Sequence, residues 1–575
     1  MYSLIRNGLL GLGLAILGAS PVLAQTEAIF SDVDLIHPVY AQHGMVATQE
    51  EYATRIGLDV LQKGGNAIDA GVAIGFALAV TLPRAGNLGG GGFMIIHSAE
   101  TGKTVALDFR EMAPARAHRD MYLDEAGNAV AKRSRFTYKA VGVPGTVAGL
   151  ALAAEQYGTL PLAELIAPAI RLAEEGLPVS VDLSESLQGL KARFEPWPES
   201  MKIFFKDNGE SYQPGETLIQ ADLANSLKLI AEQGPKAFYE GEIAQKITAD
   251  MEANGGLITL EDMKNYRPVV REPVRGTYRG YEILSMPPPS SGGVHVVQIL
   301  NMLEHYPIKA LGHNSASTIH RVAEAMKLAY ADRSEHLGDP DFSRIPVKGL
   351  ISKEYAAELV KQIDVSRARP ASEIKPNNPV PYESDQTTHY SVMDKDGNVV
   401  STTYTINFSY GSGIVAKGTG ILLNNEMDDF SAKPGVPNAY GLIGGEANAV
   451  EGGKRPLSSM TPTIIMKDGE VFLVTGSPGG SRIITTVLQI IMNVIDHGMN
   501  IAEATVAPRI HHQWVPDEIR IEEGISPDTI ALLQALGHKV EVKSAMGSTQ
   551  SIMRLPEGLY GFSDTRRRNS LTAGY

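Results

Sequence analysis

The chain has 575 residues, no cysteine and a formal net charge of −14 at pH 7, because 65 Asp and Glu outnumber 51 Lys and Arg. This length suits one large layered domain or two closely packed segments. The missing cysteines exclude disulfides, a thiolate nucleophile and a thiolate metal site, and the acidic balance argues against nucleic acid as a partner.

The first 24 residues have the pattern of a secretory signal peptide. Arg6 precedes an apolar run from Leu9 to Leu17, and Val22-Leu23-Ala24 fits the small-residue rule for cleavage. We predict cleavage after Ala24. A membrane anchor is the weaker alternative, because the run is well short of the roughly 20 residues that span a bilayer. We therefore expect a periplasmic or secreted protein without a stable membrane anchor.

Two helices are predicted near the start of the mature chain. Between Glu50 and Lys63 the apolar residues follow helical spacing, and Gly64-Gly65 supplies a stop, which predicts a surface helix with one buried stripe. The run from Ala67 to Val80 is apolar nearly all round, so it predicts a buried helix.

The chain then reads as mainly helical from residue 134 to about residue 331. Within it, the segment "SMPPPSSGG" at 285–293 contains three prolines, which exclude helix and predict an exposed or substrate-facing loop. From residue 367 to 386, repeated prolines and polar residues predict a linker.

After this linker the pattern changes to strands. Strands are predicted at 388–393 and 399–406 around a turn, and a second hairpin follows around the "KDG" turn at 467–469. Ser481 is predicted to cap a helix that runs to about His497 and ends at Gly498. A helical first part and a hairpin-rich second part predict an α+β fold in layers around a sheet core.

Metal, phosphate and serine-hydrolase motifs are weak. His511 and His512 are adjacent and point to different faces of any regular element, so a structural role is favoured. The glycine cluster at 86–93 lacks the features of a P-loop or a dinucleotide fingerprint, which favours tight packing. The chain has no G-x-S-x-G elbow, which argues against a serine hydrolase.

Two other motifs suit acyl transfer. Gly479 and Gly480 precede a predicted helix, where backbone N–H groups suit an oxyanion, although the motif alone favours an ordinary glycine turn. A cut between Gln386 and Thr387 would give Thr387 its own base, an α-amino group with an unperturbed pKa of ~8. A Thr-Thr pair before a strand is usually only strand-forming sequence, so spacing alone does not support this role.

Several long motifs, in order, resemble those of the γ-glutamyltranspeptidase family, whose members are also called glutathione hydrolases. They are "NLGGGGFM", "DFREMAP", "PGTVAG", "SMPPPSSGG", "YADRSEHLGDPDF", "QTTHYSVMDKDGNVVSTTYTIN", "LLNNEMDDFS", "KRPLSSMTPTI" and "TGSPGGSRI". The resemblance covers nearly the whole mature chain.

The resemblance implies an N-terminal-nucleophile hydrolase of the bacterial periplasmic type. Its fold would be a four-layer αββα sandwich shared by two subunits, which one precursor makes by cutting itself. The signal peptide would be residues 1–24, the large subunit 25–386 and the small catalytic subunit 387–575. Thr387 Oγ would attack the Gln386 carbonyl, and hydrolysis of the resulting ester would free the Thr387 amine.

The resemblance also implies the reaction and its donors. Thr387 would attack the γ-amide of glutathione or another γ-glutamyl donor, and the γ-glutamyl ester would pass to water, an amino acid or a peptide. Thr405 would hydrogen-bond the nucleophile, while the Gly479 and Gly480 amides would hold the oxyanion. No cofactor and no metal are expected.

Donor recognition needs separate contacts for the α-carboxylate and the α-ammonium. By similarity, the carboxylate side consists of Arg110, Ser458 and Ser459. The ammonium side consists of Asn407, Glu426 and Asp429. For Arg110, a buried ion pair with Asp108 or Glu111 is the structural alternative.

The segment 434–453 resembles the family's lid loop, with Tyr440 as its gate, which favours small substrates. A glutaryl-cephalosporin acylase of the same fold is the nearest alternative enzyme, but its acyl group lacks the α-ammonium. A periplasmic binding protein that never cleaves is the alternative from another class.

Overall fold

The computed structural model describes residues 34–376, 388–433 and 445–575. The chain divides into a short unit, Met1–Leu35, and a main unit, Ile36–Tyr575. In the short unit only Asp34 and Leu35 are described, and neither lies in a helix or strand. The predicted signal peptide, Thr387 and Tyr440 lie outside the described residues.

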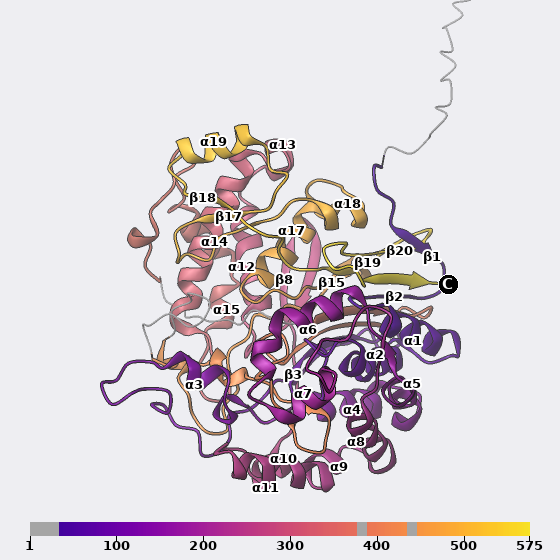
Figure 1. Ribbon diagram of the computed structural model, residues 1–575. Helices are drawn as coiled ribbons and strands as arrows, with labels where there is room; N and C mark the ends of the chain where they lie inside the picture. Colours follow the sequence, from indigo (N-terminus) through magenta and orange to yellow (C-terminus); the bar gives the residue numbers. More distant parts are fainter. Residues whose placement is uncertain (1–33, 377–387, 434–444) are drawn as a thin grey trace, which may run out of the picture. The chain divides into compact units, whose positions relative to one another are not determined.

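Two seven-stranded antiparallel sheets form the centre of the main unit (Figure 1). The first has the order β1-β20-β19-β15-β14-β9-β8, with strands at Val39–Ala41, Gly558–Ser563, Gln550–Leu555, Glu470–Thr475, Thr463–Lys467, Tyr281–Ser285 and Val274–Tyr278. The second has the order β21-β2-β10-β11-β3-β4-β7, with strands at Leu571–Gly574, Met45–Thr48, Thr388–Met393, Val399–Thr405, Gly91–His97, Thr104–Phe109 and Val269–Arg271. Each sheet therefore contains strands from before and after residue 387.

Helices cover the outer face of each sheet, which gives four layers. The second sheet packs against the group α1 (Glu51–Gln62), α2 (Ala67–Thr81), α4 (Thr146–Tyr157), α5 (Leu162–Glu175) and α8 (Ala221–Gln233). The first sheet packs against α12 (Gly292–Leu303), α14 (Ala316–His336) and α17 (Arg482–Ile495). Figure 1 shows the two helix groups on opposite sides of the strands.

The remaining elements are short or peripheral. Helices are α3 (Ala131–Arg135), α6 (Val181–Phe194), α7 (Pro198–Phe204), α9 (Lys236–Tyr239), α10 (Glu242–Ala253), α11 (Leu260–Asn265), α13 (Ile308–Leu311), α15 (Val347–Leu350), α16 (Lys353–Val360), α18 (Ile501–Val506) and α19 (Pro527–Ala535). Small sheets contain β5 (Leu177–Pro178), β6 (Thr217–Leu218), β12 (Val415–Ala416), β13 (Ile421–Leu422), β16 (Ile510–His511), β17 (Ile519–Ile521) and β18 (Val540–Val542). Within the described ranges, no helix combines the length and apolar character needed to cross a bilayer.

Side chains of β11 alternate between the helix layer and the other sheet. Val400 and Tyr404 belong to the core beneath α2, whereas Ser401 Oγ accepts a hydrogen bond from the Thr463 amide of β14 at 3.1 Å. Because side chains in a strand alternate with a period of two, Thr405 shares the face of Ser401. The predicted catalytic end of β11 therefore lies between the sheets.

The periodic predictions are confirmed. The predicted helices are α1 and α2, and every residue of α2 is buried. The two predicted hairpins are β10–β11 and β14–β15. The glycine cluster packs tightly as expected, since a Cβ on Gly90 would lie 2.1 Å from the Thr405 carbonyl oxygen.

One local prediction was incomplete and another was wrong. The region 134–331 is mainly helical as predicted, but it also supplies the short strands β5 to β9, and in β7, β8 and β9 polar and charged residues weaken the alternation of apolar residues. Ser481 stands at the start of α17 but does not cap it. Its backbone is already helical, with φ −50° and ψ −31°, and its hydroxyl donates to Gln513 Oε1 at 2.8 Å.

Candidate active site

The predicted site residues lie where strands end and loops begin. Arg110 follows β4, Thr405 ends β11, and Glu426 and Asp429 form the ends of a 3₁₀ turn, η3 (Glu426–Asp429). The serine pair precedes β14, and the two glycines lie between β15 and α17. All the predicted side chains in the described part of the chain are buried: Arg110, Thr405, Asn407, Glu426, Asp429, Ser458 and Ser459.

Arg110 is the centre of the cluster. Its two Nη groups donate to Glu426 Oε1 and Asp429 Oδ2. Its Nε donates to the Pro456 carbonyl at 3.2 Å, and Nη2 also donates to the Leu457 carbonyl at 3.3 Å. The predicted carboxylate-binding arginine therefore contacts both predicted ammonium-binding acids and the backbone directly before the serine pair.

The alternative partners of Arg110 are also close. Glu111 Oε2 lies 3.5 Å from Arg110 Nη1. Asp108 accepts from the Arg110 backbone amide at 3.0 Å, but its carboxylate pairs with the Arg271 side chain at 2.8 Å. Glu111 thus adds a third carboxyl to the cluster, whereas Asp108 belongs to a neighbouring ion pair.

The cluster around Arg110 contains three carboxyl groups and one guanidinium. Burial raises the pKa of Glu426 to about 8, although Arg110 opposes the shift. Burial likewise raises the pKa of Glu111 to about 7 and raises that of Asp429. Burial alone would lower the pKa of Arg110, but the carboxylates outweigh it and raise this pKa. Because one guanidinium stands among three carboxyls, the raised pKa values keep this cluster partly protonated near neutral pH.

Each residue of the predicted ammonium side has one buried oxygen without a hydrogen-bond donor among the described residues. Asn407 Oδ1, Glu426 Oε2 and Asp429 Oδ1 receive no hydrogen bond from any residue that the structure describes. The Asn407 backbone has φ +73°, and its amide donates to Thr405 Oγ1 at 2.8 Å. Its Nδ2 donates to the Asn425 carbonyl at 2.9 Å, which leaves the side-chain oxygen as an acceptor. Buried acceptors normally have donors, so the set suits a ligand with several N–H groups.

The two serines receive hydrogen bonds from fixed donors. Ser458 Oγ accepts from the Met460 amide at 3.1 Å. Ser459 Oγ accepts from Arg333 Nη2 at 2.8 Å. Each hydroxyl therefore has its own proton left to donate, as recognition of a carboxylate requires.

The two glycines just before α17 both have positive φ, a backbone conformation that few other residues adopt. Gly479 has φ +134° and Gly480 has φ +60°. The next carbonyl, that of Ser481, accepts from the Tyr330 hydroxyl at 2.5 Å. Helix α14 therefore contacts both the glycine segment, through Tyr330, and the serine pair, through Arg333.

Comparison with known proteins gives one consistent family. The family model described as gamma-glutamyltranspeptidase matches residues 53–574. A "Glutathione hydrolase proenzyme" of Escherichia coli (strain K12) is 59% identical over 543 residues, which cover 94% of this chain and 93% of that protein. The chain belongs to the γ-glutamyltranspeptidase family.

Solved structures agree on the fold of this chain. The cephalosporin acylase from Bacillus halodurans aligns with a TM-score of 0.84 at 31% identity, covering 95% of this chain and 98% of that chain. The γ-glutamyltranspeptidase of Helicobacter pylori aligns with a TM-score of 0.56 at 51% identity, covering 56% of this chain and 93% of that chain. The predicted N-terminal-nucleophile hydrolase fold is confirmed. The chain is an enzyme of γ-glutamyl transfer, made as an autoprocessed precursor.

Sequence reasoning missed a buried histidine two residues after Thr387. Thr388, the first described residue after the cut, pairs with Tyr404 in the β10–β11 ladder. His389 follows, with Nδ1 2.8 Å from Thr403 Oγ1 and Nε2 3.1 Å from Ser391 Oγ. Burial lowers its pKa to about 3, so the ring is neutral at pH 7. His389 anchors the strand and carries no positive charge.

One group of three side chains among the described residues has metal-ligand character: His320, Glu324 and His538. His320 Nδ1 lies 2.7 Å from His538 Nε2, which is a hydrogen-bond distance. Glu324 Oε1 already pairs with the Lys327 ammonium at 2.7 Å. A buried ammonium on the only carboxylate of the group disfavours a second cation.

His511 and His512 have the structural role predicted for them. His511 lies 2.9 Å from Thr485 Oγ1, and His512 Nε2 lies 3.3 Å from Asp517.

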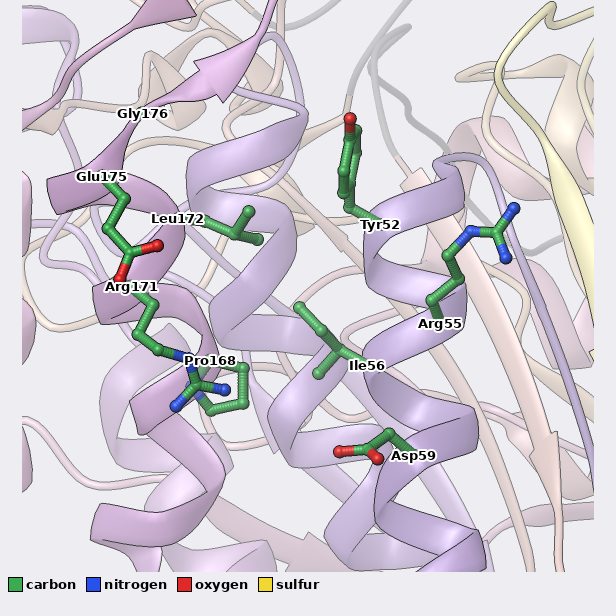
Figure 2. Close-up of a pocket in the computed structure, with 9 residues that line it drawn as sticks. All are labelled: Tyr52, Arg55, Ile56, Asp59, Pro168, Arg171, Leu172, Glu175 and Gly176. Carbon is green, nitrogen blue, oxygen red and sulfur yellow. The ribbon is translucent and has the colours of Figure 1, made fainter.

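Two surface hollows formed by described residues lie away from the predicted site residues. A hollow of about 330 Å³ lies between α1 and α5, and its lining includes Tyr52, Ile56 and Asp59 of α1 and Arg171 and Glu175 of α5 (Figure 2). A larger one of about 950 Å³ borders the turn of the β10–β11 hairpin, at the opposite end of β11 from Thr405. Neither contains a predicted site residue, so the buried cluster around Arg110 remains the candidate site.

Proposed function

We propose that the precursor cuts itself between Gln386 and Thr387, and that the new N-terminal Thr387 transfers γ-glutamyl groups from glutathione and related donors. The acceptors are water and the amines of amino acids or peptides. The observation that carries this proposal is that Asn407 Oδ1, Glu426 Oε2 and Asp429 Oδ1 receive no hydrogen bond from the described residues, while both acids contact Arg110. An ammonium brings three N–H donors and a positive charge, which match this acidic, acceptor-rich position.

The reaction has two acyl transfers on one hydroxyl. In maturation, Thr387 Oγ attacks the Gln386 carbonyl, and the acyl group moves from nitrogen to oxygen, which frees the α-amine; water then hydrolyses the ester to the Gln386 carboxylate and the free Thr387 hydroxyl. In turnover, that amine takes the proton of Oγ as the hydroxyl attacks the γ-amide carbonyl. The proton then passes to the leaving amine, and water or an acceptor amine releases the γ-glutamyl group from the ester.

Thr405 and the glycine pair support this chemistry. The residue after the cut, Thr388, pairs with Tyr404, the residue before Thr405. Thr405 Oγ1 accepts from the Asn407 amide, which holds this hydroxyl at the end of β11, and we assign it to the hydrogen bond with the nucleophile. The Gly479 and Gly480 amides, at the start of α17, are assigned to the oxyanion.

The donor's two charged groups bind on different sides of Arg110. The α-ammonium binds Asn407, Glu426 and Asp429, and the α-carboxylate binds the Arg110 guanidinium with Ser458 and Ser459. A glutaryl group has no ammonium, so it would leave buried acceptors unfilled, at a cost of about 1–3 kcal/mol for each such group. This difference favours γ-glutamyl donors over the acylase alternative.

The remaining assignments concern export and access. Residues 1–24 act as the signal peptide, and the mature enzyme works in the periplasm or outside the cell. The subunits are 25–386 and 387–575, and Tyr440 gates the site from the lid loop.

The experiment that tests this function is the intact mass of the purified protein under denaturing conditions, with N-terminal sequencing. We expect two chains, the smaller beginning Thr387-Thr388-His389, and release of p-nitroaniline from γ-glutamyl-p-nitroanilide. One uncut chain without this activity would contradict the proposal and favour a binding protein.

Binding of L-glutamate to the mature enzyme is expected to release protons at pH 7. Glu426 and Glu111, with pKa values of about 8 and 7, are largely or partly protonated in the empty site. An arriving ammonium favours their ionised forms, so their pKa values fall and protons leave. Calorimetry at one pH in phosphate and in Tris, which differ in ionisation heat, gives the number of protons released.

Two variants control this measurement. Glu426→Gln removes the group with the higher pKa and should reduce the release. Glu174→Gln removes an exposed carboxylate that pairs with Lys228, and it should leave the release unchanged. Binding without any net proton change would refute the protonated acid cluster.

A further inference from the structure

Arg333 is a fully buried arginine that reaches the serine pair from α14. Its Nε donates to Ser291 Oγ at 2.9 Å, and its Nη2 donates to Ser459 Oγ at 2.8 Å. Ser291 precedes α12 and Ser459 precedes β14, so one guanidinium joins three segments that are distant in the sequence.

These contacts fix the directions of the hydroxyl protons. A guanidinium has only donors, so both serine oxygens must accept from it. The Ser291 hydroxyl donates its proton to the Ser458 carbonyl, at 2.8 Å. The Ser459 hydroxyl must then donate its proton, and Ser291 Oγ, 3.3 Å away, is a long and weak acceptor for it. Ser459 is therefore oriented to donate to a better acceptor, such as a carboxylate.

The state of Arg110 makes this orientation important. Both of its Nη groups contact carboxylates, those of Glu426 and Asp429. A donor's α-carboxylate must share this guanidinium with the two acids, so it depends more on the serine hydroxyls. A charge-assisted bond from Arg333 also polarises the Ser459 hydroxyl and makes it a stronger donor.

We propose that Arg333 is a positioning residue for the donor's α-carboxylate. It holds Ser459 Oγ as an acceptor, so that the Ser459 hydroxyl donates to the carboxylate. The inference rests on the proposed function, because it places a γ-glutamyl donor at this serine pair.

A double-mutant cycle on the mature enzyme tests the proposal, with Arg333→Met, Ser459→Ala and both changes together. With γ-glutamyl-p-nitroanilide, Arg333→Met is expected to raise KM about 10- to 100-fold, the usual effect of losing a hydrogen bond to a charged group, and to change kcat less. In the Ser459→Ala background the same change should raise KM by less than about 3-fold, because the hydroxyl that Arg333 positions is gone.

The matched control is Arg321→Met, which removes a guanidinium from the same helix. Arg321 contacts the Ser317 carbonyl and the Tyr306 ring, away from the serine pair, so KM should not change. If the Arg333→Met variant is not cut into two chains, Arg333→Lys replaces it in the same double-mutant cycle with Ser459→Ala. Lysine keeps the buried charge but cannot reach both serines with a rigid fork, so the same dependence on Ser459 is expected.

Additive effects would overturn the inference. If the change at position 333 raises KM equally with serine or alanine at 459, or leaves KM unaltered, Arg333 does not act through Ser459. Failure of the proposed function has a different signature, because the wild-type protein itself would then remain uncut or lack γ-glutamyl transfer.

Discussion

A Thr387→Ala variant is expected to remain one uncut chain without γ-glutamyl transfer. Alanine has no hydroxyl to attack the Gln386 carbonyl, so neither the ester nor the free α-amine forms. Removing a nucleophile that acts as a unit with its base costs about 10⁴- to 10⁶-fold in rate, which places residual activity below detection. Denaturing electrophoresis with intact mass, followed by assay with γ-glutamyl-p-nitroanilide, measures both effects.

Two neighbouring changes separate the nucleophile from general damage to this segment. Thr387→Ser keeps a hydroxyl and should still be cut. Thr388→Ala changes the adjacent buried threonine of β10 and leaves Thr387 in place, so it should also be cut and be active. An active Thr387→Ala protein of mature size would rule out the mechanism.

An Arg110→Lys variant is expected to be cut normally but to bind γ-glutamyl donors poorly. The guanidinium contacts Glu426, Asp429 and two carbonyls at once, and a single ammonium cannot span these positions. Losing contacts of this kind should raise the donor KM by about 100-fold, which corresponds to about 2.8 kcal/mol of binding free energy at 1.4 kcal/mol for each factor of ten. Michaelis kinetics on the purified, cut enzyme gives this value.

The matched control for Arg110→Lys lies a few residues further along the chain. Arg116 donates to the carbonyl of Leu257 from an exposed position, so Arg116→Lys should leave the donor KM unchanged. An Arg110→Lys enzyme with the wild-type KM would exclude this guanidinium from donor binding. Arg110→Met would leave buried carboxylates without a cation, and it should cost about 3–5 kcal/mol of stability.

The elements that sequence predicts well are those whose periodicity reflects burial. The all-apolar run of α2 and the alternation in β10–β11 follow from the faces that these segments bury. In β7–β9, polar and charged residues interrupt the alternation, so the strands were hidden. Ser481 has the residue type of a cap, but nothing in the sequence shows that Gln513 takes its hydroxyl.

In the candidate site, the sequence likewise indicates the residue types, whereas their contacts depend on tertiary packing. Motifs identify Arg110, Glu426 and Asp429 as residue types, but more than 300 positions separate the arginine from the acids. Their direct contact, and the excess of carboxyls that it creates, depend on the way the segments after β4 and β13 meet. Arg333 belongs to an ordinary helical pattern, and only the packing of α14 brings it to Ser459.

The order of the strands has a consequence for the lifetime of the enzyme. In one sheet β10 and β11 lie between β2 and β3, and in the other the block β20-β19-β15-β14 lies between β1 and β9. A cut at residue 387 therefore leaves two chains whose strands are interleaved, and neither chain can leave without breaking hydrogen bonds on both sides. The uncut chain folds with all its strands tethered at a high effective concentration, and the cut removes that tether. The mature enzyme would then persist because it unfolds slowly. Once it is denatured, refolding requires the two separate chains to associate, a bimolecular step that folding of the single-chain precursor does not include.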